Sequence, residues 1–140
     1  MRLLFLTLLL LIGVSTSASA QECLEYGPTV SLTGTLRSKV FPGPPNYESI
    51  KRGDRAETAM IVRLAAPICA TSKEKIPDDL SIPETDIRDV QLVITTPAHW
   101  KIAKRFLGKP LVISGTLYHA HTGHHRTKVL MMVSELKPKQ

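Results

Sequence analysis

Four of the five histidines in this chain of 140 residues lie in one short segment, which reads His-Ala-His-Thr-Gly-His-His. Zinc and copper accept three imidazoles together with a carboxylate or a water molecule. His119 and His121 share a face of an extended strand, whereas the adjacent His124 and His125 point to opposite faces. At most three can converge, so one hypothesis is a zinc or copper site formed by His119, His121 and His124, with Glu48 as a carboxylate ligand. The spacing matches no standard zinc signature.

A second unusual stretch, Gly-Pro-Pro-Asn-Tyr-Glu-Ser, begins at residue 43. Its prolines exclude a helix interior or a central strand and favour a stiff loop. We predict that loops 41–54 and 119–126 form a binding rim, and that protonation of its histidines strengthens binding in acid. The predicted ligand-binding residues are Pro45, Asn46, Tyr47, Glu48, His119, His121, His124, His125 and Arg126. In a simpler interpretation, Thr122-Gly123 is a hairpin turn, the histidines satisfy local hydrogen bonds, and Tyr47 packs on the core.

Catalysis has little support in the sequence. The chain contains no Gly-x-Ser-x-Gly, His-Glu-x-x-His or Ser-x-x-Lys motif. General acid–base chemistry by a histidine with Glu48 or Asp54 stays open, but no nucleophile accompanies them, so no catalytic residue is predicted. The sequence favours a non-catalytic binding module, with the metal-binding protein as the alternative.

Hydrophobic periodicity indicates the elements that must position these loops. Alternation with a period of two predicts strands at 29–41, 57–64, 90–95, 111–118 and 128–136. Between the third and fourth strands, apolar residues recur at helical spacing over 97–107. Thr96 is a good N-cap, Pro97 a good first helical residue and Gly108 a good residue after the helix end. The polar stretch 71–86 is expected to be a surface loop.

The order of three strands, one helix and two strands (β-β-β-α-β-β) is that of a mainly β, five-stranded OB-like barrel with one capping helix. Gly34 and Gly115 lie where strands of a small barrel bend or approach closely. A two-layer α+β sheet is the alternative fold. OB folds bind ligands on the face of strands two and three, between the loops that join strands one to two and four to five. Here these are the same two loops of unusual composition.

The N-terminus has the pattern of a secretory signal peptide over residues 1–20: Arg2, an apolar run, and small residues ending Ala-Ser-Ala. The apolar run is too short to span a bilayer, so we expect no membrane span after cleavage. Residues 21–140 then form a single OB-like domain in an oxidising compartment, most simply the periplasm. There, Cys23 and Cys69 are expected to form a disulfide. A metal site formed by both thiolates is the alternative, although Cys-x-x-Cys spacing is absent.

The net charge of +6 falls to +5 when Arg2 is removed with the signal peptide. A basic protein attracts anionic partners, and outside the cytoplasm these are anionic envelope components or acidic proteins. Export argues against nucleic acid. Because the charges are scattered, a merely soluble basic surface is the plainer interpretation, and the sequence specifies no oligomeric state.

Several motifs together resemble one known family. They comprise Gly-Pro-Pro-Asn-Tyr-Glu-Ser-Ile at 43–50, Pro-Ile-Cys at 67–69, Val-Gln-Leu-Val at 90–93, Gly-Thr-Leu at 115–117 and Thr-Gly-His-His at 122–125. Together they look like an uncharacterised family of small secreted bacterial proteins with a domain of unknown function. The resemblance covers nearly all of the predicted mature chain. It implies export and one domain, but no particular chemistry.

Overall fold

The computed structural model describes residues 22–73 and 82–139. The elements, in chain order, are β1 (Leu24–Glu25), β2 (Thr29–Pro42), the short 3-10 helix η1 (Ile50–Arg52), β3 (Ala56–Thr71), β4 (Glu84–Val93), α1 (Pro97–Arg105), β5 (Pro110–His119) and β6 (Val129–Pro138). The predicted signal peptide, 1–20, lies outside the described residues, as does the middle of the predicted loop 71–86. Within the described part of the chain, no helix is long and apolar enough to cross a membrane.

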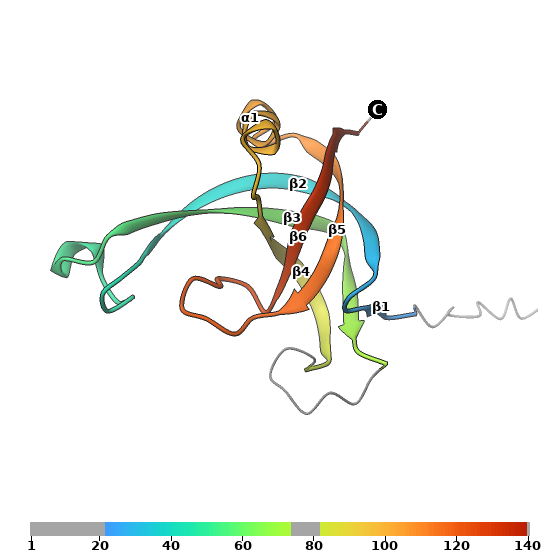
Figure 1. Cartoon of the computed structure of the whole chain (residues 1–140), viewed down its shortest axis with the longest axis horizontal. Coiled ribbons are helices and arrows are strands. Elements are labelled where there is room, and N and C mark those ends of the chain that lie inside the picture. Colours follow the sequence, from blue (N-terminus) through green and yellow to red (C-terminus); the bar gives the residue numbers. More distant parts are fainter. Residues whose placement is uncertain (1–21, 74–81, 140) are drawn as a thin grey trace, which may run out of the picture.

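The six strands form one mixed sheet in the order β1-β3-β2-β5-β6-β4, and an additional pairing joins β3 to β4. Strands β2 to β6 therefore form a near-ring of five strands. β1 pairs with β3 as a sixth strand, and α1 lies at the top of the view in Figure 1. Most neighbours are antiparallel, whereas β4 runs parallel to β6 and β1 parallel to β3. The predicted mainly β class, with one helix between the third and fourth long strands, is confirmed.

The core occupies the inside of the near-ring because each strand alternates apolar and polar residues. Alternate residues of β2 and β3, such as Leu32, Leu36 and Val62, are buried there. The predicted close approach at Gly34 is present, since a Cβ on this residue would collide with the carbonyl oxygen of Arg63. Other buried side chains of this core are Val90, Leu111, Ile113, Leu117, Val129 and Met131.

The helix begins as the sequence predicts. The hydroxyl of Thr96 accepts a hydrogen bond of 3.2 Å from the backbone N–H of His99, and Pro97 is the first helical residue. The helix ends two residues earlier than predicted, at Arg105. Gly108 then adopts a left-handed φ of 75°, and its N–H donates to the carbonyl of Leu36 at 2.8 Å. This hydrogen bond ties the helix end to β2.

Two strands differ most from prediction, β3 at its end and β4 at both ends. The second long strand does not end at residue 64 but continues through Pro67 to Thr71, with register shifts against β4 after Arg63. The next strand begins at Glu84, inside the stretch expected to be a loop, and ends at residue 93 instead of 95. Long-range pairing with β4 stabilises an extended backbone that composition alone does not indicate.

The predicted disulfide between Cys23 and Cys69 is confirmed. It lies beside the parallel pairing of Leu24 with Ala70, so the start of the described chain is fastened to the end of β3. A metal site that uses both thiolates is thereby excluded, because neither cysteine is free.

Candidate functional site

The loop between β2 and β3 (residues 43–55) contacts the loop between β5 and β6 (residues 120–128). The hydroxyl of Tyr47 lies 3.0 Å from Nε2 of His124, and the two rings meet edge to face with centroids 5.3 Å apart. Nη2 of Arg126 donates to the carbonyl oxygen of Pro42 at 2.8 Å. Two segments about 80 residues apart in the sequence are therefore joined by side-chain contacts.

Asp54 determines the shape of the 43–55 loop. Its buried carboxylate, on a residue only 5% exposed, accepts hydrogen bonds from the backbone N–H groups of Asn46, Glu48 and Ser49 at 2.7–2.9 Å. These bonds, above all those from Ser49 and Asn46, hold the pKa of Asp54 below its ordinary value. The loop they enclose places Tyr47 at a φ of 59°, a left-handed conformation that non-glycine residues rarely adopt.

Arg126, His124 and Glu57 form a polar cluster under the two loops. Oε2 of Glu57 accepts a 3.0 Å hydrogen bond from Nη2 of Arg126 and lies 3.0 Å from Nδ1 of His124. Hydrogen bonds from His124 and then Arg126 lower the pKa of Glu57. The Arg126 guanidinium also lies over two aromatic rings, 5.1 Å from the centroid of Phe41 and 5.6 Å from that of Tyr47. With a proton on Nδ1, the His124 ring donates to Glu57 while its Nε2 accepts from the Tyr47 hydroxyl, which satisfies both contacts.

The buried Gln91 of β4 attaches the 120–128 loop to the outer face of the sheet. Its side-chain amide donates to the carbonyl of His124 at 3.1 Å and accepts from the backbone N–H of Arg126 at 2.6 Å. Its own N–H donates to Oγ1 of Thr127 at 2.9 Å. Sequence reasoning did not identify Gln91, since one polar residue within an apolar strand gives little indication of a partner in a distant loop.

The remaining histidines have other partners. Nε2 of the half-buried His119 lies 3.1 Å from Oε1 of Glu84, whose pKa is lowered mainly by the hydrogen bond from Lys128. The backbone N–H of His121 donates to Nδ1 of His125 at 2.9 Å, and the two rings are 4.6 Å apart. Burial, followed by the charges of His121 and His124, lowers the pKa of His125.

The predicted metal ligands are not brought together. His119 contacts Glu84, His124 contacts Tyr47 and Glu57, and the exposed Glu48 pairs with Arg52 at 2.9 Å. Across residues 22–73 and 82–139, no group of three or more His, Cys, Asp or Glu side chains is placed to hold a metal ion. Of the predicted rim residues, Tyr47, His124 and Arg126 meet directly.

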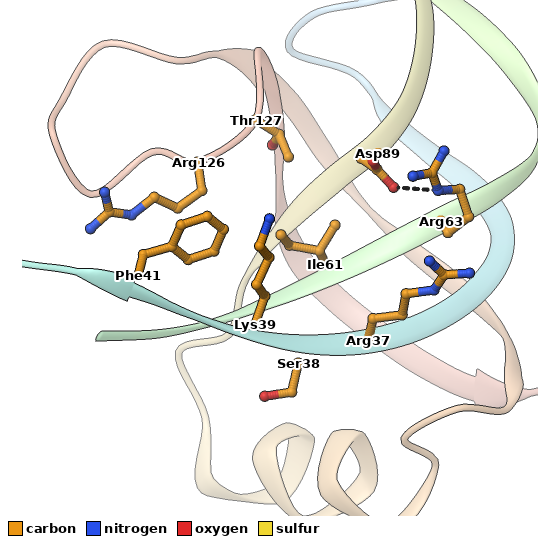
Figure 2. Close-up of a pocket in the computed structure, with 9 residues that line it drawn as sticks. All are labelled: Arg37, Ser38, Lys39, Phe41, Ile61, Arg63, Asp89, Arg126 and Thr127. Carbon is orange, nitrogen blue, oxygen red and sulfur yellow. Dashed lines mark ion pairs between the residues drawn. The ribbon is translucent and has the colours of Figure 1, made fainter. Parts of the chain in front are cut away.

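Beside the joined loops lies an open groove of about 290 Å³ on the outer face of the sheet (Figure 2). Four cationic side chains line it, and Phe41 and Ile61 form its apolar part. Arg63 pairs with Asp89 at 2.8 Å, and Arg126 pairs with Glu57. The lining residues are Arg37, Ser38, Lys39, Phe41, Ile61, Arg63, Asp89, Arg126 and Thr127.

Two of these cations lack a carboxylate partner in the described chain. Arg37 forms no ion pair with any described residue, and Lys39 makes only a contact 5.0 Å from the centroid of the Phe41 ring. With four cations and two carboxylates (Asp89 and Glu57), this part of the surface carries an excess of two positive charges. The groove is therefore suited to anionic groups and to planar carboxylates or phosphates that guanidinium binds in particular.

The sequence contains a signal for this groove that the histidines and prolines obscured. Arg37, Lys39 and Phe41 occupy alternate positions of a strand, so they share its outer face. Ile61 and Arg63 do the same on the neighbouring strand, where Arg37 is paired with Ile61. Charged residues at a period of two on these two strands therefore mark the groove in the sequence.

Searches of curated proteins and of solved structures gave no significant match to the chain. The scan against protein families did: residues 89–137 match the model of a domain of unknown function, DUF4431. This segment runs from β4 to β6 and contains Gln91, α1 and the whole 120–128 loop. The predicted resemblance to an uncharacterised family is confirmed there, whereas the motifs at 43–69 lie outside the match. Over residues 89–137, the chain is therefore similar to the DUF4431 domain family.

Proposed function

We propose that this protein is an exported, non-catalytic binding module that holds an anionic envelope ligand or an acidic partner protein in the groove. One observation carries the proposal: Arg37 and Lys39 face an open groove without a carboxylate partner among the described residues. Unpaired cations on a half-apolar surface attract an anion at long range and bind it with charge-assisted hydrogen bonds at short range.

The rest of the site supplies shape and contact area. Arg126 is held by Pro42, Glu57 and two rings, so its position is set before a ligand arrives. A preorganised group loses less side-chain entropy on binding. Phe41 and Ile61 offer apolar area for the uncharged part of the ligand, as in most binding sites.

A finer description of the fold supports the same site. We propose that the near-ring is an OB-like barrel, and the strand neighbours β2–β3–β4, the parallel pair β4–β6 and the return through β5 to β2 support this. OB folds bind ligands on the face of their second and third strands, between two loops. In this chain these are β3, β4, the 43–55 loop and the 120–128 loop. Because folds host many functions, the unpaired cations carry the proposal and the fold only supports it.

Export is part of the proposal and rests on the signal-peptide pattern and the disulfide. Disulfides persist in the periplasm and outside the cell. The mature protein is expected to begin at Gln21, and N-terminal sequencing of the protein from a periplasmic extract tests this. A chain that retains residues 1–20 in the cytoplasmic fraction would contradict it.

Binding to dextran sulfate, measured by isothermal titration calorimetry, tests the anion site. We expect Lys39→Glu to weaken binding about tenfold, since it puts a like charge beside the ligand. Lys101→Glu makes the same charge change on the exposed face of α1 and is the matched control. It should change affinity no more than about twofold, as expected for a charge screened by salt. Equal effects of the two substitutions would show that net charge alone drives binding and would refute the site.

A further inference from the structure

Strand β2 has one free edge beside the groove. It pairs with β5 only over Thr29–Thr35, but with β3 as far as Pro42. The part of the β2–β3 hairpin next to the 43–55 loop therefore projects beyond the near-ring as a pair of strands (Figure 1). No strand in the described chain pairs with residues 37–42 on the side away from β3.

The hydrogen bonds at Leu36 show which backbone groups face this edge. Its N–H donates to the carbonyl of Lys109 at 3.3 Å, and its carbonyl accepts from Gly108 at 2.8 Å, so both point away from β3. In an antiparallel strand this direction recurs every second residue. The N–H and C=O groups of Ser38 and Val40 therefore point to the free edge, and neither residue has a partner there in the described chain.

The side chains of the same segment divide between two faces. Arg37, Lys39 and Phe41 lie in the groove, and the Ser38 side chain points to the opposite side (Figure 2). Val40 shares the face of Ser38 and is 54% exposed, which is unusual for a large apolar side chain. The edge thus presents cations on one face and an apolar residue on the other.

We infer that the ligand of this groove is an extended acidic segment of a partner protein, added as a further strand along residues 37–41 of β2. The inference deepens the proposed function and rests on it. Alternate acidic side chains of the added strand would lie directly opposite Arg37 and Lys39. Its intervening apolar side chains would cover Val40, while its backbone pairs with Ser38 and Val40.

Charge decides between possible occupants of the edge. A second copy of this chain, paired through the same edge, would bring Arg37 and Lys39 against their own counterparts, and like charges opposite each other are destabilising. Leu36 is already paired with Lys109 and Gly108. Pro42 has no N–H, and its carbonyl accepts from Arg126. The free edge is therefore residues 37–41, which span roughly 17 Å at strand rise. A segment of about six residues is therefore sufficient.

The test uses a fluorescein-labelled peptide, Glu-Val-Glu-Thr-Glu-Val, and fluorescence anisotropy with the oxidised mature protein. Two methylated derivatives are compared with it. In the first, the backbone nitrogens of the Glu residues carry methyl groups, and in the second, those of the Val and Thr residues do. Strand addition predicts that one derivative loses at least about tenfold in affinity while the other binds like the parent. Loss at the Val and Thr nitrogens indicates an antiparallel strand, and loss at the Glu nitrogens a parallel one. Equal binding by both derivatives would overturn the inference.

Val40→Pro tests the protein side, because it removes an N–H that faces the free edge and not β3. Proline is tolerated at such positions, and Val40→Thr keeps the N–H as the matched control. We expect Val40→Pro to lower peptide affinity about tenfold and to leave binding of dextran sulfate unchanged. The methylated peptides on the unaltered protein decide the question independently of how this variant folds.

The failures of the two proposals are distinguishable. If dextran sulfate binds in a Lys39-dependent manner and the peptide does not bind, the strand-addition inference is wrong and the anion site stands. If neither probe binds, both are wrong.

Discussion

Arg126 is the residue on which closure of the two loops depends most directly, so Arg126→Met is the sharpest test of the site. Methionine retains much of the aliphatic stem but loses the guanidinium. The hydrogen bond to the Pro42 carbonyl (2.8 Å) is a charged one, worth about 1.5 kcal/mol at the low end of its range. The contacts with Phe41 and Tyr47 add about 0.7 kcal/mol each.

Together these terms predict that Arg126→Met lowers the free energy of unfolding by about 3 kcal/mol. For a domain of this size the loss corresponds to a decrease in Tm of about 10 °C. Thermal and urea unfolding, followed by circular dichroism, measure both quantities. Arg126→Lys keeps the charge but not the planar group, so its free energy of unfolding should lie between those of the parent protein and Arg126→Met.

Arg88→Met is the matched control, since the ion pair of Arg88 with Asp86 is exposed on both sides. Its effect should stay within about 0.5 kcal/mol. If Arg126→Met were no more destabilising than Arg88→Met, the loops would be closed by other contacts. The description of Arg126 as a preorganised part of the groove would then be wrong.

Three further predictions concern the scaffold. Cys23→Ser with Cys69→Ser should cost about 4 kcal/mol in urea unfolding, because the bridge closes a loop across 46 residues; a loss below about 1 kcal/mol would contradict this. Burial lowers the pKa of His125 from 6.5, so the unfolded chain binds more protons just below that pH and stability falls with acidification there. His125→Asn should flatten this slope, and an NMR titration of His125 with a midpoint at or above 6.5 would refute the assignment. The pKa of Asp54 is lowered from 3.8, so its stabilising effect is present above pH 3.8 and is lost as the pH falls through its lower folded value. Asp54→Asn should therefore lower Tm at pH 7, and its difference from the parent should shrink below pH 3.8; a constant difference would contradict the charge-based account.

The sequence predicts those elements whose signals are local. Thr96 and Pro97 mark the helix start with groups that contact their own neighbours, and the alternation from Leu32 to Leu36 needs only one buried face. The extension of β3 through Pro67 and the start of β4 at Glu84 were missed. Both depend on cross-strand pairing, which no short window of sequence displays.

The difference between local and long-range contacts also explains which parts of the candidate site the sequence could predict. The sequence indicates two loops of unusual composition, but the four histidines look equivalent in it. Their partners come from distant strands: His119 meets Glu84, and His124 meets Glu57. The groove was missed because its cations lie in a regular strand, where residues such as Arg37 resemble ordinary solvent-facing positions.

Closure of the near-ring also has a kinetic consequence. Val30 pairs with Gly115, and Gln91 pairs with Leu130, so chain segments 85 and 39 residues apart must meet before the sheet is complete. Such non-local pairing raises contact order, and domains of this kind fold in roughly milliseconds to seconds. Until β4 and β6 pair, the edge of β6 that carries Leu130 and Met131 has no neighbour on that side. Pairing of β4 with β6 therefore removes an edge that could otherwise pair with another chain.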